Sequence, residues 1–313
     1  MDLDAHLEGL LRGDESAVDA LCVLGPEAVA AVPTLKDVVA KGKPPARLAA
    51  LQVLAAIGAG ARAAMPELLH ALGQGDGEVR TLAADALAAL GPDAVGPLLG
   101  ELDDDDAKVR QASARALGTI AGAARAAVPA LLARALDPSE EEEVALRAIW
   151  ALGEIGDPSM LAPLATLFTE RGGTVGVWIA EACAKVGRGA RPVADAFRAE
   201  LHRDDAWLAL AAAHALIRIG EHVDAAVWAL VACLQRAEAD VRLEAALSLG
   251  EIGPKAAAAL PALKAAERDD DEEIRAQATL AIAKIRPEAV LRPRGPSPAA
   301  RAMGPKGPEA FDG

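Results

Sequence analysis

The sequence predicts an all-α fold: a right-handed α-solenoid, or superhelix, of about nine helical hairpins. Hydrophobic residues make up 52% of the 313 residues but aromatic residues only 2%, so the core must consist of Ala, Leu, Val and Ile. Such side chains suit closely packed helices and give little reason to expect a sheet. A motif also returns at intervals close to 33 residues, which is the signature of a repeat array.

The motif of each repeat closes at one residue, called the anchor below. The nine anchors are Gly25, Gly58, Gly91, Ala121, Gly156, Gly187, Gly220, Gly253 and Arg286. Apolar residues stand one and four positions before each anchor, and Ala or Ser eight before it, except at Ile179. Positions separated by three, four and seven lie on one face of a helix. Each motif therefore predicts a helix that ends at its anchor, where Gly can take the left-handed conformation that closes a helix.

A second helix is predicted after a short linker, because most repeats carry a Pro there. These are Pro33, Pro66, Pro97, Pro129, Pro163, Pro192 and Pro261. Pro is tolerated in the first helical turn, where the amide hydrogen it lacks would have no partner. Acidic loops such as LDDDDAKVR and ERDDDEEIR then lead into the next repeat. They lack the ligand spacing of a calcium loop, so we expect their carboxylates to cap helices.

A single helix pair cannot bury its apolar stripe, so neighbouring repeats must stack. We predict a solenoid over residues 1–286, with 1–13 as an N-terminal capping helix. Residues 287–313 carry six Pro and four Gly, which predicts a disordered tail.

Composition excludes several classes of partner. The net charge is -14 and no stretch concentrates Lys and Arg, so we expect no nucleic acid. Cys22, Cys183 and Cys233 lie far apart without metal-ligand spacing, which indicates packed, reduced thiols, no metal and a cytoplasmic protein. The acidic start is unlike a signal peptide, and no apolar segment reaches about 18 residues, so we expect no membrane partner.

The pattern VRxxAAxALGxIG, followed by a linker and a Pro-led helix, resembles the HEAT-like repeats first associated with phycobilin lyases. The resemblance spans about residues 14–286 and implies HEAT-like helical hairpins. It leaves the function open, because lyases, scaffolds, adaptors and signalling proteins share this repeat. It also implies a structural role between repeats for an Arg column eleven positions before the anchors, with a row of anion-binding donors as the alternative. The column consists of Arg47, Arg80, Arg110, Arg242 and Arg275.

Repeats five to seven lose this Arg and gain every Trp in the chain. Trp150, Trp178 and Trp207 stand in columns otherwise polar, so we expect them on a convex surface, where large rigid aromatics are typical binding anchors. In the alternative interpretation they fill the seams between repeats, using space left by Gly176 and the missing Arg. Trp228 replaces the usual Pro, and we expect it in the core.

Glu181 and His214 lie near these Trp residues and complete the candidate partner-binding set. They do not predict an active site, because the five His residues show no repeated pairing and no His-Glu dipeptide supplies metal ligands. We therefore expect no catalysis and no cofactor. The expected function is a scaffold or adaptor that binds a protein or peptide, with a mixed concave face formed by the second helices.

Two alternatives stay open. The first is a phycobilin-lyase-like or other HEAT-repeat enzyme, or a chromophore-binding protein, which would need cations for the tetrapyrrole propionates beside an apolar slot. The second is assembly through self-association, so the sequence leaves the oligomeric state undetermined.

Overall fold

The computed structural model describes residues 3–202 and 204–286, so the predicted tail at 287–313 lies outside the described residues. All regular elements in the described residues are helices. The chain divides into two compact units, Met1–Ala226 and Val227–Gly313.

Even-numbered helices are the predicted motif helices. They are α2 (Glu15–Leu24), α4 (Pro44–Ile57), α6 (Gly77–Ala89), α8 (Ala107–Ile120), α10 (Glu142–Ile155), α12 (Gly173–Val186), α14 (Ala206–Ile219), α16 (Ala239–Ile252) and α18 (Glu272–Ile285). Odd-numbered helices include the predicted Pro-led helices. They are α1 (Leu3–Arg12), α3 (Val32–Lys41), α5 (Met65–Gln74), α7 (Val95–Glu101), α9 (Val128–Leu136), α11 (Leu161–Arg171), α13 (Ala194–Glu200), α15 (Val223–Cys233) and α17 (Leu260–Ala266).

Each tight hairpin joins an odd-numbered helix to the even-numbered helix that follows it. α3 packs against α4, α5 against α6 and α9 against α10, and α1 and α2 pair in the same way. The acidic loop is therefore the turn of the hairpin. We expected each repeat to begin with the motif helix, but each hairpin begins with the odd-numbered helix instead, which is the Pro-led helix in most repeats. The sequence period is the same whichever helix is counted first, so it could not distinguish the two arrangements.

The acidic loops cap the helices that follow them, as expected. A side-chain carboxylate accepts hydrogen bonds from the first N–H groups of five even-numbered helices. These caps are Asp14, Asp76, Asp106, Asp205 and Asp271.

The linker after most anchors is a 3-10 helix, which the sequence did not predict. η1 covers Gly25–Ala31, η2 covers Gly58–Ala64 and η4 covers Ala121–Ala127. Ala residues three positions apart in these turns are fully buried, among them Ala28, Ala31, Ala61, Ala64, Ala124 and Ala127. Since a 3-10 helix repeats every three residues, these Ala residues form one packed face. The linker thus belongs to the core of the repeat.

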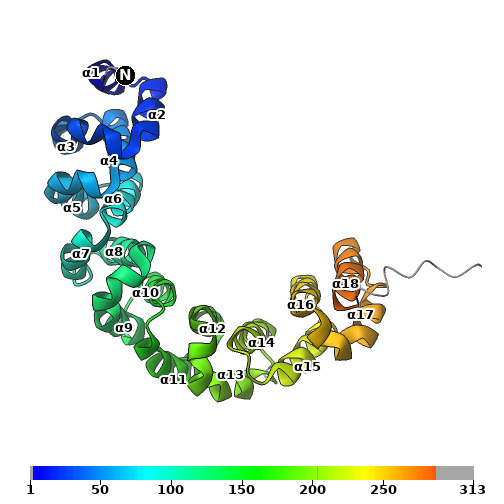
Figure 1. The fold of residues 1–313 in the computed structure, drawn as a ribbon. Helices are drawn as coiled ribbons and strands as arrows, with labels where there is room; N and C mark the ends of the chain where they lie inside the picture. Colours follow the sequence, from blue (N-terminus) through cyan, green and yellow to red (C-terminus); the bar gives the residue numbers. More distant parts are fainter. Residues whose placement is uncertain (1–2, 203, 287–313) are drawn as a thin grey trace, which may run out of the picture. The chain divides into compact units, whose positions relative to one another are not determined.

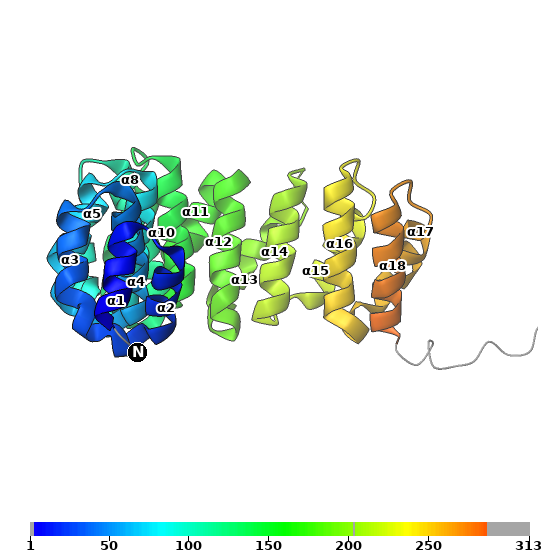
Figure 2. The ribbon, with the colours of Figure 1, turned by 90° about the horizontal axis from the view of Figure 1, so that it is seen from above.

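In the first unit, Figures 1 and 2 show the even-numbered helices in one row and the odd-numbered helices in another. The even-numbered row lies on the inner side of the curve in Figure 1. Small residues let these helices approach closely: a Cβ on Gly153 would lie 2.8 Å from the Cα of Ala182. The outer row has larger side chains between its helices, such as Phe168 and Phe197, whose ring centroids lie 4.7 Å apart.

The unequal spacing of the two rows explains which face is concave. Even-numbered neighbours such as α8 and α10 contact each other more extensively than odd-numbered neighbours such as α11 and α13. The expectation that the second helices form the concave face is therefore wrong for the first unit.

In the second unit, α17 and α18 form a hairpin and α18 packs on α16. Gly250 makes a close seam here as well, since its Cβ would lie 3.1 Å from the Cα of Ala281.

Three continuous helical stretches are long and apolar enough to cross a membrane, by length and composition alone: Glu15–Lys41, Pro44–Gln74 and Ala107–Leu136. Each consists of two α-helices joined by a 3-10 turn that starts at a residue with positive φ. The expectation of no membrane partner stays a prediction.

Candidate partner-binding surface

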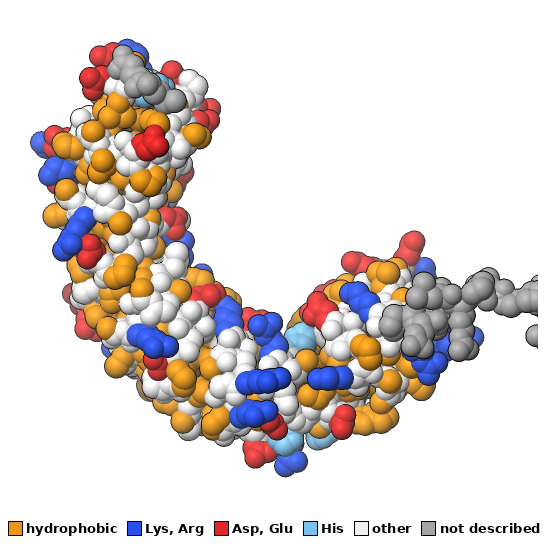
Figure 3. Space-filling view, in the orientation of Figure 1, with side chains coloured by type: hydrophobic (Ala, Val, Ile, Leu, Met, Phe, Trp, Pro, Cys, Tyr) orange, Lys and Arg blue, Asp and Glu red, His pale blue; other side chains and the backbone are white. Residues whose placement is uncertain are grey.

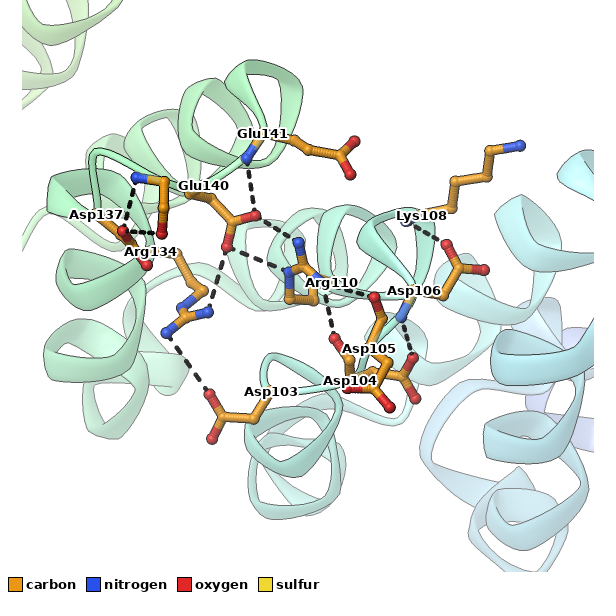
Figure 4. A network of polar contacts seen from close by, with 11 residues as sticks. Asp103, Asp104, Asp105, Asp106, Lys108, Arg110, Arg134, Asp137, Glu140 and Glu141 are labelled. Atoms are coloured by element: carbon orange, nitrogen blue, oxygen red, sulfur yellow. Dashed lines mark hydrogen bonds and ion pairs between the residues drawn. The ribbon is translucent and has the colours of Figure 1, made fainter.

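The loop edge of the first unit carries a polar network centred on Arg110 (Figure 4). Its guanidinium donates to the backbone carbonyls of Asp104 and Asp105 at 2.8 and 3.1 Å. It also donates to both carboxylate oxygens of Glu140 in the next loop, at 2.6 and 3.2 Å. Arg134 reaches the same carboxylate at 3.3 Å. These contacts tie two successive hairpins together through charge-assisted hydrogen bonds.

The pKa of Glu140 is lowered by the balance of two opposing effects. Burial raises it, while the hydrogen bonds from Arg110 and from the Glu141 N–H, and the positive charges of Arg110 and Arg134, lower it. Glu140 is thus held as a carboxylate between two guanidinium groups.

Other members of the Arg column make related contacts. Arg242 donates to the Arg236 and Ala237 carbonyls and pairs with Asp269 at 2.8 Å. Arg80 donates to the Leu72 carbonyl at 3.0 Å and pairs with Asp106 at 3.3 Å.

Two members of the column lack a partner in a following loop among the described residues. Within the described residues, the Arg275 guanidinium donates only to the carbonyls of Asp269 and Asp270. The Nε of Arg47 is buried and has no hydrogen-bond partner among these residues, and it lies beside a cavity of about 40 Å³ lined by His70 and Gln74.

The inner face of the first unit is formed by the columns 13, 9, 6 and 2 positions before the anchors on α6, α8, α10, α12 and α14. Steps of three and four keep these positions on one side of a helix. Trp207, Trp178 and Trp150 occupy three of these columns on successive helices. They therefore lie on the concave side, whereas the sequence placed them on a convex surface.

Trp150 is half-buried and combines both interpretations made from the sequence. Its indole lies across Gly118 of the preceding inner helix, where any Cβ would clash with the ring. The guanidinium of Arg147 lies 5.4 Å from the ring centroid and the ammonium of Lys185 lies 5.9 Å from it. Lys185 also pairs with Glu154. The ring thus fills a seam and binds two cations at the surface.

The other Trp residues differ in exposure. Trp178 is half-buried, and Trp207 is 49% exposed. Trp228, expected in the core, is 58% exposed, because its side chain lies on the outward-facing side of α15 between the buried Val227 and Ala229. The space at Gly176 is filled by Leu208 and Phe168 rather than by a Trp.

Glu181 and His214 occupy one column, six positions before their anchors, on the adjacent helices α12 and α14. Glu181 is exposed, and His214 is half-buried and engaged in an interaction. Both belong to the same inner face as the three Trp residues.

A basic groove lies at α6, α8 and α10, and it was not predicted from the sequence. It has a volume of about 420 Å³. Its lining residues are Gly77, Arg80, Thr81, Lys108, Gln111, Ala112, Arg115 and Arg147. Four of them are cationic and none is acidic. The available signal was that Lys108, Arg115 and Arg147 all fall in the columns that form the inner face.

Arg147 is the unusual cation of this groove. It is half-buried and its guanidinium lies over the Trp150 ring, and no carboxylate of the described residues lies within ion-pair distance of it. Burial lowers its pKa, and the positive charge of Arg115 lowers it further. Arg115 is itself paired with Asp85 at 2.8 Å.

Basic side chains continue beyond Trp150. Figure 3 shows Lys and Arg side chains gathered on the edge of the molecule over α12 and α14. Arg218 donates to the carbonyl of Ala184 at 3.4 Å, and Arg191 pairs with Glu221 at 2.9 Å.

The described residues hold no group of three or more His, Cys, Asp and Glu side chains placed to bind a metal ion. Burial raises the pKa of the Cys183 thiol to about 12, so it stays protonated at neutral pH. A buried, protonated thiol is a poor nucleophile.

Stacked helical hairpins, joined by Arg contacts and small-residue seams, define an α-solenoid repeat protein. HEAT repeats match the sequence at residues 32–118, 65–141, 95–182, 128–217 and 227–293. Four of these matches begin at the start of an odd-numbered helix, in agreement with the hairpins of the structure. The chain belongs to the HEAT-repeat family. No curated protein matches the chain.

Several solved structures are similar to the chain. An engineered protein is 24% identical with a TM-score of 0.44, covering 90% of this chain and 88% of its own. Human deoxyhypusine hydroxylase is 22% identical with a TM-score of 0.38, covering 84% and 99%. A chain from the structure of Kap95p with RanGDP is 13% identical with a TM-score of 0.58, covering 91% of this chain and 45% of that one. The last likeness shows the fold alone, an all-α solenoid.

Proposed function

We propose that this protein is a non-catalytic scaffold or adaptor that binds a protein or peptide along the inner face of its first unit. HEAT repeats commonly serve as protein-interaction scaffolds. The observation that carries the proposal is the row of Trp150, Trp178 and Trp207 on this face. Trp207 is 49% exposed, so much of its side chain takes no part in packing the fold and is free to contact a partner.

The chemistry of the row suits protein recognition. Trp is enriched among the residues that dominate binding energy, since it buries a large area with few rotatable bonds. Trp150 is already fixed between Arg147 and Lys185, so little conformational entropy is lost when a partner covers it. A concave stack of repeats offers an extended surface of the kind that repeat proteins use for binding.

Affinity capture from the native host, followed by titration of the purified partner, tests the proposal. Trp207→Ala is the informative variant and Trp228→Ala is the matched control, because both side chains are about half exposed but only Trp207 lies on the inner face. We expect Trp207→Ala to weaken binding by about tenfold, or 1.4 kcal/mol, and Trp228→Ala to leave it unchanged. Equal circular dichroism spectra of the variants verify folding. Unchanged affinity for Trp207→Ala would contradict the proposed surface.

The resemblance to phycobilin-lyase repeats supports a second candidate, binding of a linear tetrapyrrole. Four cations line the groove, and one of them, Arg147, lies over the Trp150 ring. Cations beside an aromatic ring are the kind of partners that propionates and a conjugated ring system require. The four cations are Arg80, Lys108, Arg115 and Arg147. A shift of the bilin absorption band on mixing with the protein would favour this candidate. An unchanged spectrum would remove it.

The proposal includes a cytoplasmic location and no cofactor. It rests on the composition and on the three cysteines, which are free, with Cys183 and Cys233 buried and Cys22 half-buried.

A further inference from the structure

The basic groove is a positively charged region on a protein whose net charge is negative. The chain as a whole has a net charge of -14, yet the residues lining this groove include four cations and no acid. Such a region attracts negatively charged partners even when the net charge of the protein repels them.

Internal ion pairs leave part of this charge uncompensated. Arg80 pairs with Asp106 and Arg115 pairs with Asp85, at 3.3 and 2.8 Å. Within residues 3–202 and 204–286, the side chains of Lys108 and Arg147 have no carboxylate partner. The groove therefore keeps two unpaired positive charges, one exposed and one half-buried.

The half-buried charge distinguishes this groove from an ordinary solvated surface. Arg147 is half-buried on the Trp150 ring, and the side chain of Arg115 lines the same groove. A half-buried cation without an anion is unfavourable, and an anionic group placed beside it would relieve that cost. Gln111 and Thr81 line the same groove and add neutral polar groups.

Geometry favours a chain segment over a small ion. The lining residues come from three successive inner helices, and the groove leads onto the aromatic row at Trp150. A peptide lying across these helices can place several carboxylates on the cations and an apolar side chain on the indole.

We infer that the groove formed by α6, α8 and α10 binds an acidic, Asp- and Glu-rich segment of the partner protein, with Lys108 and Arg147 contacting its carboxylates. This inference rests on the proposed function, because it names the chemistry of the partner for the same inner face.

The test uses the full chain and two fluorescein-labelled peptides, a Glu-Ser repeat and its Gln-Ser counterpart, followed by fluorescence anisotropy at low ionic strength. Saturable binding of the Glu peptide alone is expected, weakening with added salt because exposed charge pairs are screened. Arg147→Gln and Lys108→Gln should each weaken binding by about tenfold. Arg171→Gln and Lys43→Gln are matched controls, since these exposed cations lie outside the groove, and both should leave binding unchanged.

Lys108→Gln keeps the test decisive if Arg147→Gln fails to fold, because Lys108 is exposed. Equal binding of both peptides, or equal loss in the groove and control variants, would overturn the inference. Nucleic acid that competes fully with the Glu peptide would overturn it as well. If the Glu peptide does not bind but Trp207→Ala still weakens capture of the partner, only the inference about charge fails and the inner-face proposal survives.

Discussion

Ala121 occupies an anchor position where seven of the other described anchors are Gly. Its φ is 57° and its ψ is -135°, a conformation that is strained for a residue with a Cβ. We expect Ala121→Gly to raise the free energy of unfolding by about 1 kcal/mol, because Gly adopts this conformation without strain. Urea denaturation followed by circular dichroism measures the change.

Gly91→Ala is the converse control. Gly91 has a φ of 69° and a Cβ there would meet no atom within 4 Å, so only backbone strain is added. We expect this substitution to lower the free energy of unfolding by about 1 kcal/mol. If Ala121→Gly and Gly91→Ala changed the free energy of unfolding in the same direction, backbone strain would not explain the effects.

Glu140 links stability to pH. The pKa of Glu140 is lowered in the folded protein, so its ionised form contributes stability above its unfolded pKa, and this contribution is lost as pH falls through the lower folded pKa. Glu140→Gln should cost about 2 kcal/mol at neutral pH, because Arg110 and Arg134 lose their carboxylate. The variant should also lose less further stability on acidification.

Urea denaturation at neutral pH and below pH 4 gives both quantities for the parent and the variant. Glu273→Gln is a suitable control, because this exposed side chain takes no part in the network. Parallel pH dependences of the parent and Glu140→Gln would contradict the assignment of the effect to this carboxylate.

At the scale of elements, the seams between inner helices depend on the absence of a side chain. A Cβ on Gly118 would clash with the Trp150 ring and lie 2.9 Å from the Cα of Ala151. Gly118→Ala should therefore destabilise the protein by about 1–3 kcal/mol through overpacking. Gly96→Ala in α7 should leave stability unchanged or raise it, since its Cβ meets nothing within 4 Å and Ala favours helix. A stabilising Gly118→Ala substitution would show that the helices have room to separate.

The motif helices could be predicted because their apolar columns repeat at helical spacing. The capping carboxylates could be predicted once the starts of these helices were known, because Asp14, Asp76 and Asp106 stand directly before them. The 3-10 turns could not, because Ala residues three positions apart, such as Ala28 and Ala31, are too few to establish a period. The sequence also did not show which two helices form each hairpin, because a repeating pattern does not indicate where each repeat begins.

At the scale of the molecule, the sequence does not state which row of helices lies closer together within the first unit. Both rows carry apolar stripes, and only the small residues at Gly118 and Gly153 distinguish the inner row. The candidate site was therefore found in part: the Trp residues were identified, but on the wrong side of the curve. The groove escaped notice because Lys108, Arg115 and Arg147 occupy different columns and meet only when repeats stack.

The central claim is that the inner face of the first unit binds the partner. Hydroxyl-radical footprinting of the full chain, free and with its captured partner, tests this claim in one experiment, because Trp is readily oxidised where it is exposed. Trp207 reports on the inner face, and Trp228 on α15 is an internal reference of similar exposure, at 49% and 58%. We predict that the partner protects Trp207 and leaves the oxidation of Trp228 unchanged. Protection of Trp228 with Trp207 still fully oxidised would contradict this prediction.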